Sequence, residues 1–208
     1  MPQPNFDLYL ITDRKLARGG DLCAVLERAL DGGVKAIQLR EKDLDGKELL
    51  GIADKISVLC QRYKAQLFVN DRIDVALAVD AAGVQLGKTS LPIETARALL
   101  GPGKLIGYST HALDEAVEAE RNGADFVLFG PVHFTPSKSA YGEPQGIAAL
   151  KEIVEKVALP VYAIGGINAT NLVVTMTTGI HGVALISAVM SAANPTVAAK
   201  TILAMLER

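Results

Sequence analysis

The chain has 208 residues, of which 50% are hydrophobic and 21% charged, and its formal net charge is −2. This length supports a full hydrophobic core, and we expect residues 1–208 to form a single domain. The lack of Trp and of any basic run argues against nucleic-acid binding. The sequence contains no apolar stretch of about 18 residues, so we expect no membrane span. The N-terminus lacks the pattern of a signal peptide, so we expect a cytoplasmic protein.

Short apolar runs alternate with longer amphipathic segments along the chain. The runs are nearly continuous in apolar residues, as expected for parallel strands covered on both faces. They occupy residues 7–12, 35–40, 66–70, 83–87, 105–109, 126–132, 160–165 and 182–187. Clear helical patterns occupy residues 21–33, 72–80, 90–103 and 113–125. Eight β–α units in strict order predict a closed (β/α)₈ TIM barrel.

Several smaller expectations accompany this fold. Cys23 and Cys60 lie in helical patterns and should be structural rather than catalytic or disulfide-bonded. Ser90 is a candidate N-cap for the helix that follows it, and Ser187 is a candidate cap near the last helix. The long segment 131–146 has no helical pattern, and a loop of that length in a barrel is often functional.

Cationic and glycine-rich segments follow several of the predicted strands. In a barrel these strand ends meet at the face that carries the active site. Arg40, Lys42 and Lys138 would bring positive charge there. Gly165 and Gly166 follow the seventh strand and would let a phosphate approach the backbone. The sequence therefore predicts a binding site for a phosphorylated small molecule.

Asp71 directly follows the third strand, where a carboxylate can hold Mg²⁺ together with substrate phosphates. The alternative is that Asp71 caps the helix that begins just after it. His111 follows the fifth strand and could act as a base, a phosphate donor or a helix cap. His133 lies in the long loop and is a freer candidate for proton transfer.

Six motifs in one order resemble the thiamine-phosphate synthase family across nearly the whole chain. They are "QLREKD", "NDRIDVALAVDAAGVQLG", "IGYSTH", "GADFVLFGPVHFTPSK", "VYAIGGI" and "VALISA". The resemblance implies a (β/α)₈ barrel that joins an aminopyrimidine diphosphate to a thiazole phosphate, with release of diphosphate and use of Mg²⁺. Its partners would be these two small molecules, and the sequence leaves open whether the chain forms a homo-oligomer.

The resemblance also implies roles for individual residues. Those that contact the pyrimidine substrate and its diphosphate would be Gln38, Arg40, Lys42, Asn70 and Ser109. Those that hold phosphate and diphosphate would be Thr135, Ser137 and Lys138. Those that hold the thiazole phosphate would be Gly166, Ile186 and Ser187. Asp71 would bind the metal. Catalysis would rest on Arg40, Lys42, Ser109 and Lys138.

The stretch "GVQLGKTSLP" departs from the family pattern, which is close to "GVHLGQEDLP". Ser90 stands where the family has its second metal-binding aspartate, and Gln85 stands where it has histidine. A hydroxyl is a poorer Mg²⁺ ligand than a carboxylate. Lys88 could bring a cation to the diphosphate and partly substitute for the metal's charge.

Three alternatives to a synthase stay open on the sequence. The related thiazole tautomerases need a thiazole-phosphate site and a proton-transfer group but no metal, so the missing aspartate favours them. Their branch tends to have a histidine where this chain has Pro131, and the retained "QLREKD" and "TPSK" favour the synthase. A non-catalytic thiamine-phosphate-binding regulator is the second alternative, and another phosphate-binding barrel is the third.

Overall fold

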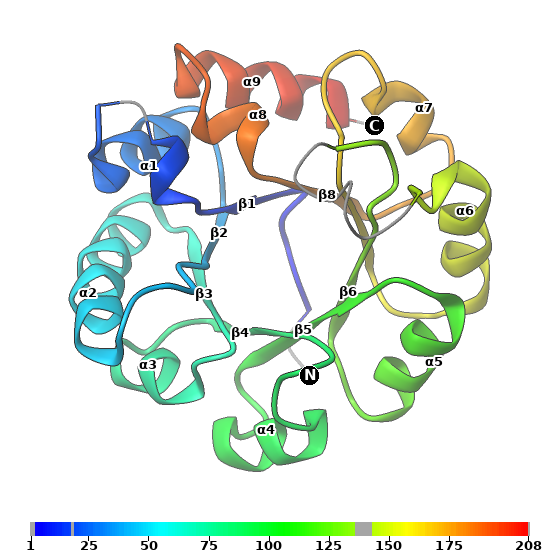
Figure 1. Cartoon of the computed structure of the whole chain (residues 1–208), viewed down its shortest axis with the longest axis horizontal. Helices are drawn as coiled ribbons and strands as arrows, with labels where there is room; N and C mark the ends of the chain where they lie inside the picture. The colour runs from blue at the N-terminus through cyan, green and yellow to red at the C-terminus, as the bar shows by residue number, and fades with distance from the viewer. Residues whose placement is uncertain (1–2, 18, 136–142, 208) are drawn as a thin grey trace.

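Eight parallel strands close into a barrel in the computed structural model, which describes residues 3–17, 19–135 and 143–207. The strands follow one another around the barrel in chain order, from β1 next to β2 through to β8 next to β1 (Figure 1). They are β1 (Leu8–Ile11), β2 (Ala36–Leu39), β3 (Gln66–Asn70), β4 (Gly83–Leu86), β5 (Leu105–Thr110), β6 (Phe126–Phe129), β7 (Val161–Ile164) and β8 (Gly182–Leu185). The predicted (β/α)₈ TIM barrel is confirmed.

Helices surround the barrel and cover the outer face of the strands (Figure 1). They are η1 (Arg14–Leu16), α1 (Leu22–Asp31), α2 (Gly46–Tyr63), α3 (Ile73–Ala78), α4 (Ile93–Leu100), α5 (Leu113–Arg121), α6 (Gly146–Lys156), α7 (Leu172–Met176), α8 (Ser187–Met190) and α9 (Pro195–Leu206). No helix among the described residues is both long and apolar enough to cross a bilayer.

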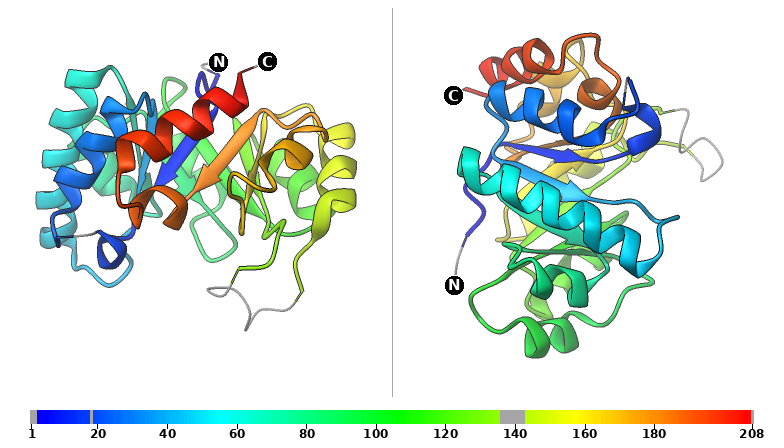
Figure 2. Two further views of the ribbon diagram at one scale, coloured as in Figure 1. Left: turned by 90° about the horizontal axis from the view of Figure 1, so that it is seen from above. Right: turned by 90° about the vertical axis from the view of Figure 1, so that its left-hand side faces the viewer.

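The barrel interior holds an aromatic layer near its N-terminal end. Phe6 precedes β1, and its ring lies 5.2 Å from Tyr9, 5.7 Å from Phe68, 5.9 Å from Phe126 and 5.0 Å from Tyr162, measured between centroids. The Tyr162 hydroxyl donates to the Phe6 carbonyl at 2.7 Å. The N-terminal segment therefore closes this end, and the loop after β6 emerges at the opposite end, where the strands finish (Figure 2). The segments that follow the strands lie at that second end, where the sequence predicts the site.

Helix starts near the open end set the shape of its loops. Asp45 and Glu48 form a reciprocal capping box at the start of α2, with Glu48 N donating to Asp45 Oδ1 at 2.9 Å. This cap follows β2 by only a few residues and so fixes where residues 40–45 run. The predicted caps are wrong at two positions. Ser90 does not cap α4. Ser187 is already the first residue of α8, and its side chain makes no capping hydrogen bond.

The two cysteines behave as the sequence indicates. Cys60 is buried on α2, Cys23 is half-buried on α1, and neither forms a disulfide. Burial raises the pKa of the Cys60 thiol to about 12, so this side chain stays protonated at neutral pH.

Candidate active site

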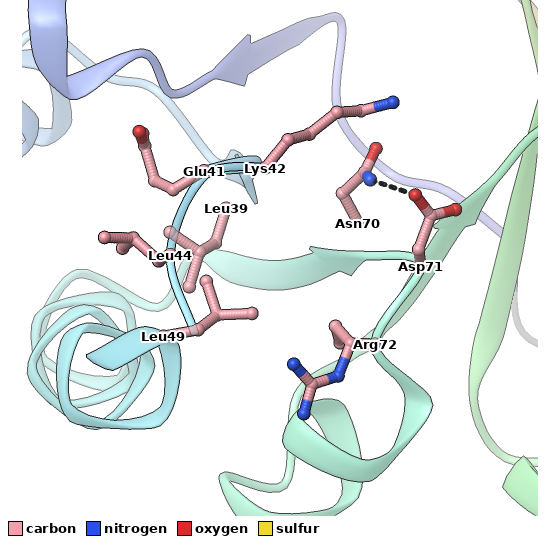
Figure 3. Close-up of a pocket in the computed structure, with 8 residues that line it drawn as sticks. All are labelled: Leu39, Glu41, Lys42, Leu44, Leu49, Asn70, Asp71 and Arg72. Carbon is pink, nitrogen blue, oxygen red and sulfur yellow. Dashed lines mark hydrogen bonds between the residues drawn. The ribbon is translucent and has the colours of Figure 1, made fainter. Parts of the chain in front are cut away.

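A pocket of about 260 Å³ opens at the C-terminal ends of β2 and β3. Its walls come from the loop after β2, the start of α2 and the turn after β3 (Figure 3). The lining residues are Leu39, Glu41, Lys42, Leu44, Leu49, Asn70, Asp71 and Arg72. Lys42 extends across the pocket above Asn70, whereas Glu41 points away from it (Figure 3). Three residues expected to bind substrate or metal, Lys42, Asn70 and Asp71, therefore lie together.

Asp71 occupies a left-handed backbone conformation, with φ of 61°. Its amide donates to the Gln85 carbonyl on the neighbouring strand at 3.0 Å, which holds the turn against β4. Its Oδ2 accepts a hydrogen bond from Asn70 Nδ2 at 2.6 Å. The first helical turn of α3 receives no side-chain cap, so the capping alternative for Asp71 is wrong. The carboxylate is instead exposed at the mouth of the barrel.

Ser90 meets Asp71 across this mouth. The Ser90 hydroxyl donates to Asp71 Oδ1, and its oxygen accepts the Gly87 amide at 2.8 Å. The residue at the family's second ligand position therefore touches the first ligand position, with a hydroxyl in place of a carboxylate. Within the described residues, no three His, Cys, Asp or Glu side chains cluster as metal ligands. Among the described residues at this point, Asp71 offers Mg²⁺ a carboxylate, Ser90 a hydroxyl oxygen and Asn70 an amide oxygen.

Two buried glutamines lie below this mouth. Gln85 is 1% exposed, and its Nε2 donates to Ser109 Oγ at 3.1 Å. Gln38 is also 1% exposed, and its side chain lies within hydrogen-bonding reach of the buried Tyr9 hydroxyl. Its contact with the pyrimidine substrate stays a prediction. Gln85, which the sequence marked as a departure, holds the predicted contact residue Ser109.

The cations near the pocket have different surroundings. Arg40 and Lys42 make no ion pair with any described residue, so both are available to an anion. Lys88 is 86% exposed, and its Nζ lies 4.0 Å from Glu115. Arg72 follows Asn70 and Asp71 at the end of the third strand, but the sequence assigned it no role. It lines the pocket and pairs with Asp74 through two hydrogen bonds.

The loop after β6 packs tightly on the end of β7. A Cβ atom at Gly166 would lie 2.4 Å from the Phe134 carbonyl oxygen and 2.7 Å from that of His133. Gly166 also has φ of 66°, which favours glycine. This packing brings Gly166 next to the segment that leads into Thr135. The predicted residues Ser137 and Lys138 lie outside the described residues.

The two candidate histidines are engaged by neighbouring groups. His133 Nε2 lies 2.9 Å from the Thr175 hydroxyl, which itself donates to the Asn171 carbonyl. The ring nitrogen must therefore be the donor. Burial lowers the pKa of His133 below its usual 6.5. His111 Nδ1 lies 2.5 Å from the Gly130 carbonyl oxygen, so this ring also donates to the backbone.

Ile186 and Ser187 lie after β8, at the same end of the barrel as the other candidates. Ser187 is exposed, and its carbonyl accepts from Ser191 Oγ at 2.7 Å. No hydrogen bond within the described residues joins the Ser187 side chain to another predicted site residue. The expected contact of Ile186 and Ser187 with the thiazole phosphate stays a prediction.

Comparisons with known proteins identify the family of the chain. A family model described as thiamine monophosphate synthase matches residues 8–189. The thiamine-phosphate synthase of Desulfitobacterium hafniense (strain DSM 10664 / DCB-2) is 46% identical over 94% of this chain and 95% of that protein, and that of Clostridium novyi is 44% identical over 95% and 97%. The solved thiamine phosphate pyrophosphorylase from Pyrococcus furiosus has a TM-score of 0.88 and 42% identity, covering 97% of this chain and 95% of that one. The chain therefore belongs to the thiamine monophosphate synthase family.

Proposed function

We propose that the open end of this barrel joins 4-amino-2-methyl-5-hydroxymethylpyrimidine diphosphate to hydroxyethylthiazole phosphate, releasing diphosphate and forming thiamine phosphate. The observation that supports this most strongly is the set of polar groups around one pocket. The cation Lys42 extends over Asn70 and the Asp71 carboxylate, and the relatives that share the full barrel are named as synthases. Such a transferase needs a site for a diphosphate leaving group, and this arrangement supplies one.

The reaction breaks the bond between the pyrimidine methylene carbon and a diphosphate oxygen. The electron-rich pyrimidine stabilises the positive charge on that carbon, and the thiazole nitrogen then forms the new C–N bond. Arg40 and Lys42 stabilise the negative charge that the diphosphate gains as it leaves, and Lys138 adds to this from the loop after β6. Positioning of the two substrates supplies the rest of the rate enhancement, so no protein nucleophile is required.

Contacts to the substrates follow from the residues near the mouth. Gln38 and Asn70 bind the pyrimidine and its diphosphate, and Ser109, held by Gln85 at 3.1 Å, is a further contact. Thr135 and Ser137 bind phosphate oxygens, and the catalytic set is Arg40, Lys42, Ser109 and Lys138. The residues that hold the thiazole phosphate are Gly166, Ile186 and Ser187.

Mg²⁺ fits the donor set when one carboxylate and substrate phosphate oxygens share it. Asp71 is the carboxylate, and Ser90 offers a hydroxyl oxygen that touches it. When bound, the ion supplies positive charge beside the diphosphate. Lys88, an exposed residue of the loop after β4, is proposed to add a second positive charge to this region.

The tautomerase alternative draws less support from the structure. It requires a proton-transfer group, and one candidate, His133, is half-buried with its Nε2 hydrogen-bonded to the Thr175 hydroxyl at 2.9 Å. The expected cytoplasmic location and the homo-oligomer stay predictions.

Product analysis tests the proposed function directly. The purified chain is mixed with both substrates, with and without Mg²⁺, and thiamine phosphate is measured by mass spectrometry over time. Catalytic formation of thiamine phosphate supports the synthase. Intact substrates, beside an active synthase from a relative as the positive control, would contradict it, and turnover of a thiazole tautomer would then be assayed.

A further inference from the structure

Charges alternate along the loop after β2. Arg40 and Lys42 are cations, and Glu41 and Asp43 are carboxylates. A diphosphate held by the two cations would therefore face two negative charges on the same loop. Unless another group neutralises these carboxylates, they would repel the ligand or pair with the very cations that should bind it.

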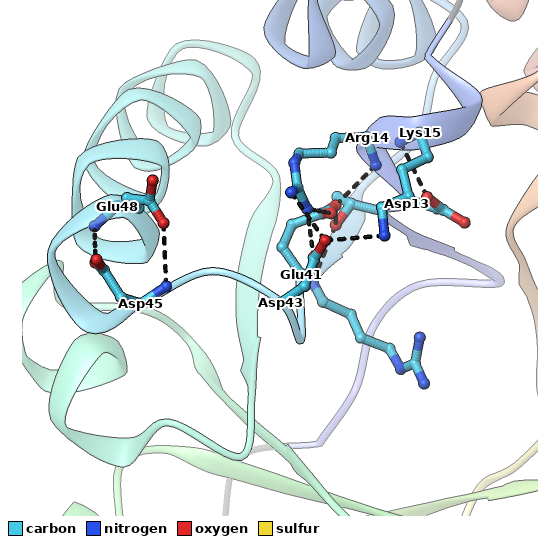
Figure 4. A network of polar contacts seen from close by, with 9 residues as sticks. Asp13, Arg14, Lys15, Glu41, Asp43, Asp45 and Glu48 are labelled. Carbon is cyan, nitrogen blue, oxygen red and sulfur yellow. Dashed lines mark hydrogen bonds and ion pairs between the residues drawn. The ribbon is translucent and has the colours of Figure 1, made fainter.

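Arg14, on the short helix η1 after β1, binds both carboxylates. Its Nη1 and Nη2 contact Asp43 Oδ1 and Oδ2 at 2.6 and 3.0 Å, and Nη1 also contacts Glu41 Oε2 at 3.0 Å (Figure 4). Lys15 Nζ lies 2.9 Å from Asp43 Oδ2. The Arg14 hydrogen bonds hold the pKa of Asp43 well below its usual range, so this carboxyl stays ionised and paired at neutral pH.

The inner part of this network is buried. The Glu41 side chain is 3% exposed, and its Oε1 accepts from the Thr12 hydroxyl at 2.7 Å and the Arg14 amide at 3.0 Å. The Thr12 oxygen in turn accepts the Arg40 amide at 2.9 Å. A continuous chain of hydrogen bonds thus joins the Arg40 backbone to the Arg14 guanidinium. A carboxylate this deeply buried needs its cationic partner.

The network therefore places the negative and positive side chains of one loop on opposite sides of it. Glu41 and Asp43 turn toward Arg14, while Lys42 extends over the pocket (Figures 3 and 4). We infer that Arg14 is a positioning residue of the anion site, which neutralises Glu41 and Asp43 so that Arg40 and Lys42 remain unpaired and directed at the diphosphate. This inference rests on the proposed function, because that function makes Arg40 and Lys42 the diphosphate contacts.

Binding of inorganic diphosphate to the whole chain tests the inference without turnover. Isothermal titration calorimetry at constant ionic strength gives its dissociation constant. We expect Arg14→Ala to weaken binding by about three- to tenfold, because Glu41 then lacks a cation, whereas Lys15 still pairs with Asp43, and the Glu41 charge acts on the ligand across the loop. Arg14→Gln keeps the stem and an amide donor, and it carries the same expectation if the alanine variant does not fold.

A double variant distinguishes neutralisation of the Glu41 charge from simple structural support of the loop by Arg14. In Arg14→Ala combined with Glu41→Gln, the released charge of Glu41 is removed while the guanidinium is still missing. We expect this double variant to recover most of the diphosphate affinity. If Arg14 only supported the loop, the double variant would bind no better than Arg14→Ala, and the inference would be wrong.

Arg97 is a matched control for loss of an ion pair. Its side chain is 22% exposed and pairs at 2.5 Å with Asp125, which is 6% exposed, near the starts of β5 and β6 at the closed end. Arg97→Ala should lower the melting temperature yet leave diphosphate affinity unchanged. An equal loss of affinity in this variant would attribute the Arg14 effect to general destabilisation and overturn the inference.

Two further variants distinguish failure of the inference from failure of the proposed function. Lys42→Ala and Arg40→Ala remove the proposed diphosphate contacts themselves. If neither weakens diphosphate binding, the proposed site is wrong and the inference falls with it. If both weaken it and Arg14→Ala does not, the proposed site stands and the inference alone is wrong.

Discussion

The Ser90 hydroxyl and the Asp71 carboxylate share a hydrogen bond across the mouth of the barrel, between the loops that follow β4 and β3. The Gly87 amide holds the same hydroxyl oxygen at 2.8 Å. Ser90 is thus fixed beside Asp71, the predicted metal ligand, and does not cap α4. The contact pairs one carboxylate with an uncharged hydroxyl, so it needs no cation to hold it together.

Ser90→Asp should restore a two-carboxylate site. Two adjacent negative charges repel each other, so we expect a lower melting temperature without metal and a larger rise on adding Mg²⁺ than in the unmodified chain. Mg²⁺ affinity in the presence of inorganic diphosphate should increase by about tenfold. Calorimetry measures the affinity, and differential scanning fluorimetry measures the melting temperature.

Ser90→Ala is the control for this substitution. It removes the hydrogen bond to Asp71 without adding charge, so stability should fall by about 1 kcal/mol and show no metal-dependent rescue. If Ser90→Asp and Ser90→Ala had the same Mg²⁺ affinity, residue 90 would not lie at a metal position.

Lys88→Ala tests whether this exposed cation assists the departure of diphosphate. Its 4.0 Å contact with Glu115 at the surface contributes little to stability, so the melting temperature should not change. We expect kcat/KM for the pyrimidine diphosphate to fall by about three- to tenfold at low salt, and by less at high salt because exposed charges are screened.

Lys151, which is 61% exposed and pairs with Glu155 on α6, provides the matched control. Lys151→Ala should leave the kinetics unchanged at every salt concentration. Unaltered turnover in Lys88→Ala would remove Lys88 from the mechanism.

The strands could be predicted because they depend on local patterns. Runs such as residues 66–70 contain consecutive buried apolar residues, here Leu67, Phe68 and Val69, and a closed parallel barrel brings all strand ends to one face. Ser90 illustrates the limit of local rules. A serine before a helix resembles a cap, but its actual partner, Asp71, is 19 positions away on the neighbouring loop.

The network around Arg14 lies beyond local rules for the same reason. Its partners Glu41 and Asp43 are 27 and 29 positions away, and only the pairing of β1 with β2 brings them together. The alternating charges of "REKD" are visible in the sequence. Which charges face the ligand depends on a cation from another strand end, which no spacing within the motif reveals.

Gly166→Ala tests the close packing of the β6 loop on β7. The added Cβ would lie 2.4 Å from the Phe134 carbonyl oxygen, so the loop leading to Thr135 must move. We expect the loss of stability to exceed the cost of placing alanine in a left-handed conformation, which is roughly 1–2 kcal/mol. kcat/KM for the thiazole phosphate should fall by about tenfold or more, because small displacements of contact groups cost rate.

Gly123 offers a matched control for backbone strain. Its φ is 92°, and it ends α5 with the Ala124 amide donating to the Ala119 carbonyl, but a Cβ there would meet nothing within 4 Å. Gly123→Ala should cost about 1–2 kcal/mol of stability and leave the kinetics unchanged. Equal kinetic effects of the two variants would show that the packing against Phe134 is irrelevant to the site.

His133 should make stability depend on pH just below neutrality. Burial lowers its folded pKa below the ordinary 6.5, so the folded protein disfavours the charged ring. Between the folded pKa and 6.5 the unfolded chain binds more protons, and stability therefore falls as the pH drops through this window and is unaffected by His133 above it. The Thr175 contact does not oppose this, because Nε2 donates in both charge states.

His133→Gln should flatten the melting temperature within that window. Because the ring is only half-buried, we expect the two profiles to differ by no more than about 2 °C, with the difference changing only below pH 6.5. His111→Gln is the control, since this ring also donates to a neighbouring loop, at the Gly130 carbonyl oxygen. Parallel melting profiles for the chain and His133→Gln from pH 5 to 8 would contradict the assignment of a buried neutral ring, because such a ring must take up a proton on unfolding in this range.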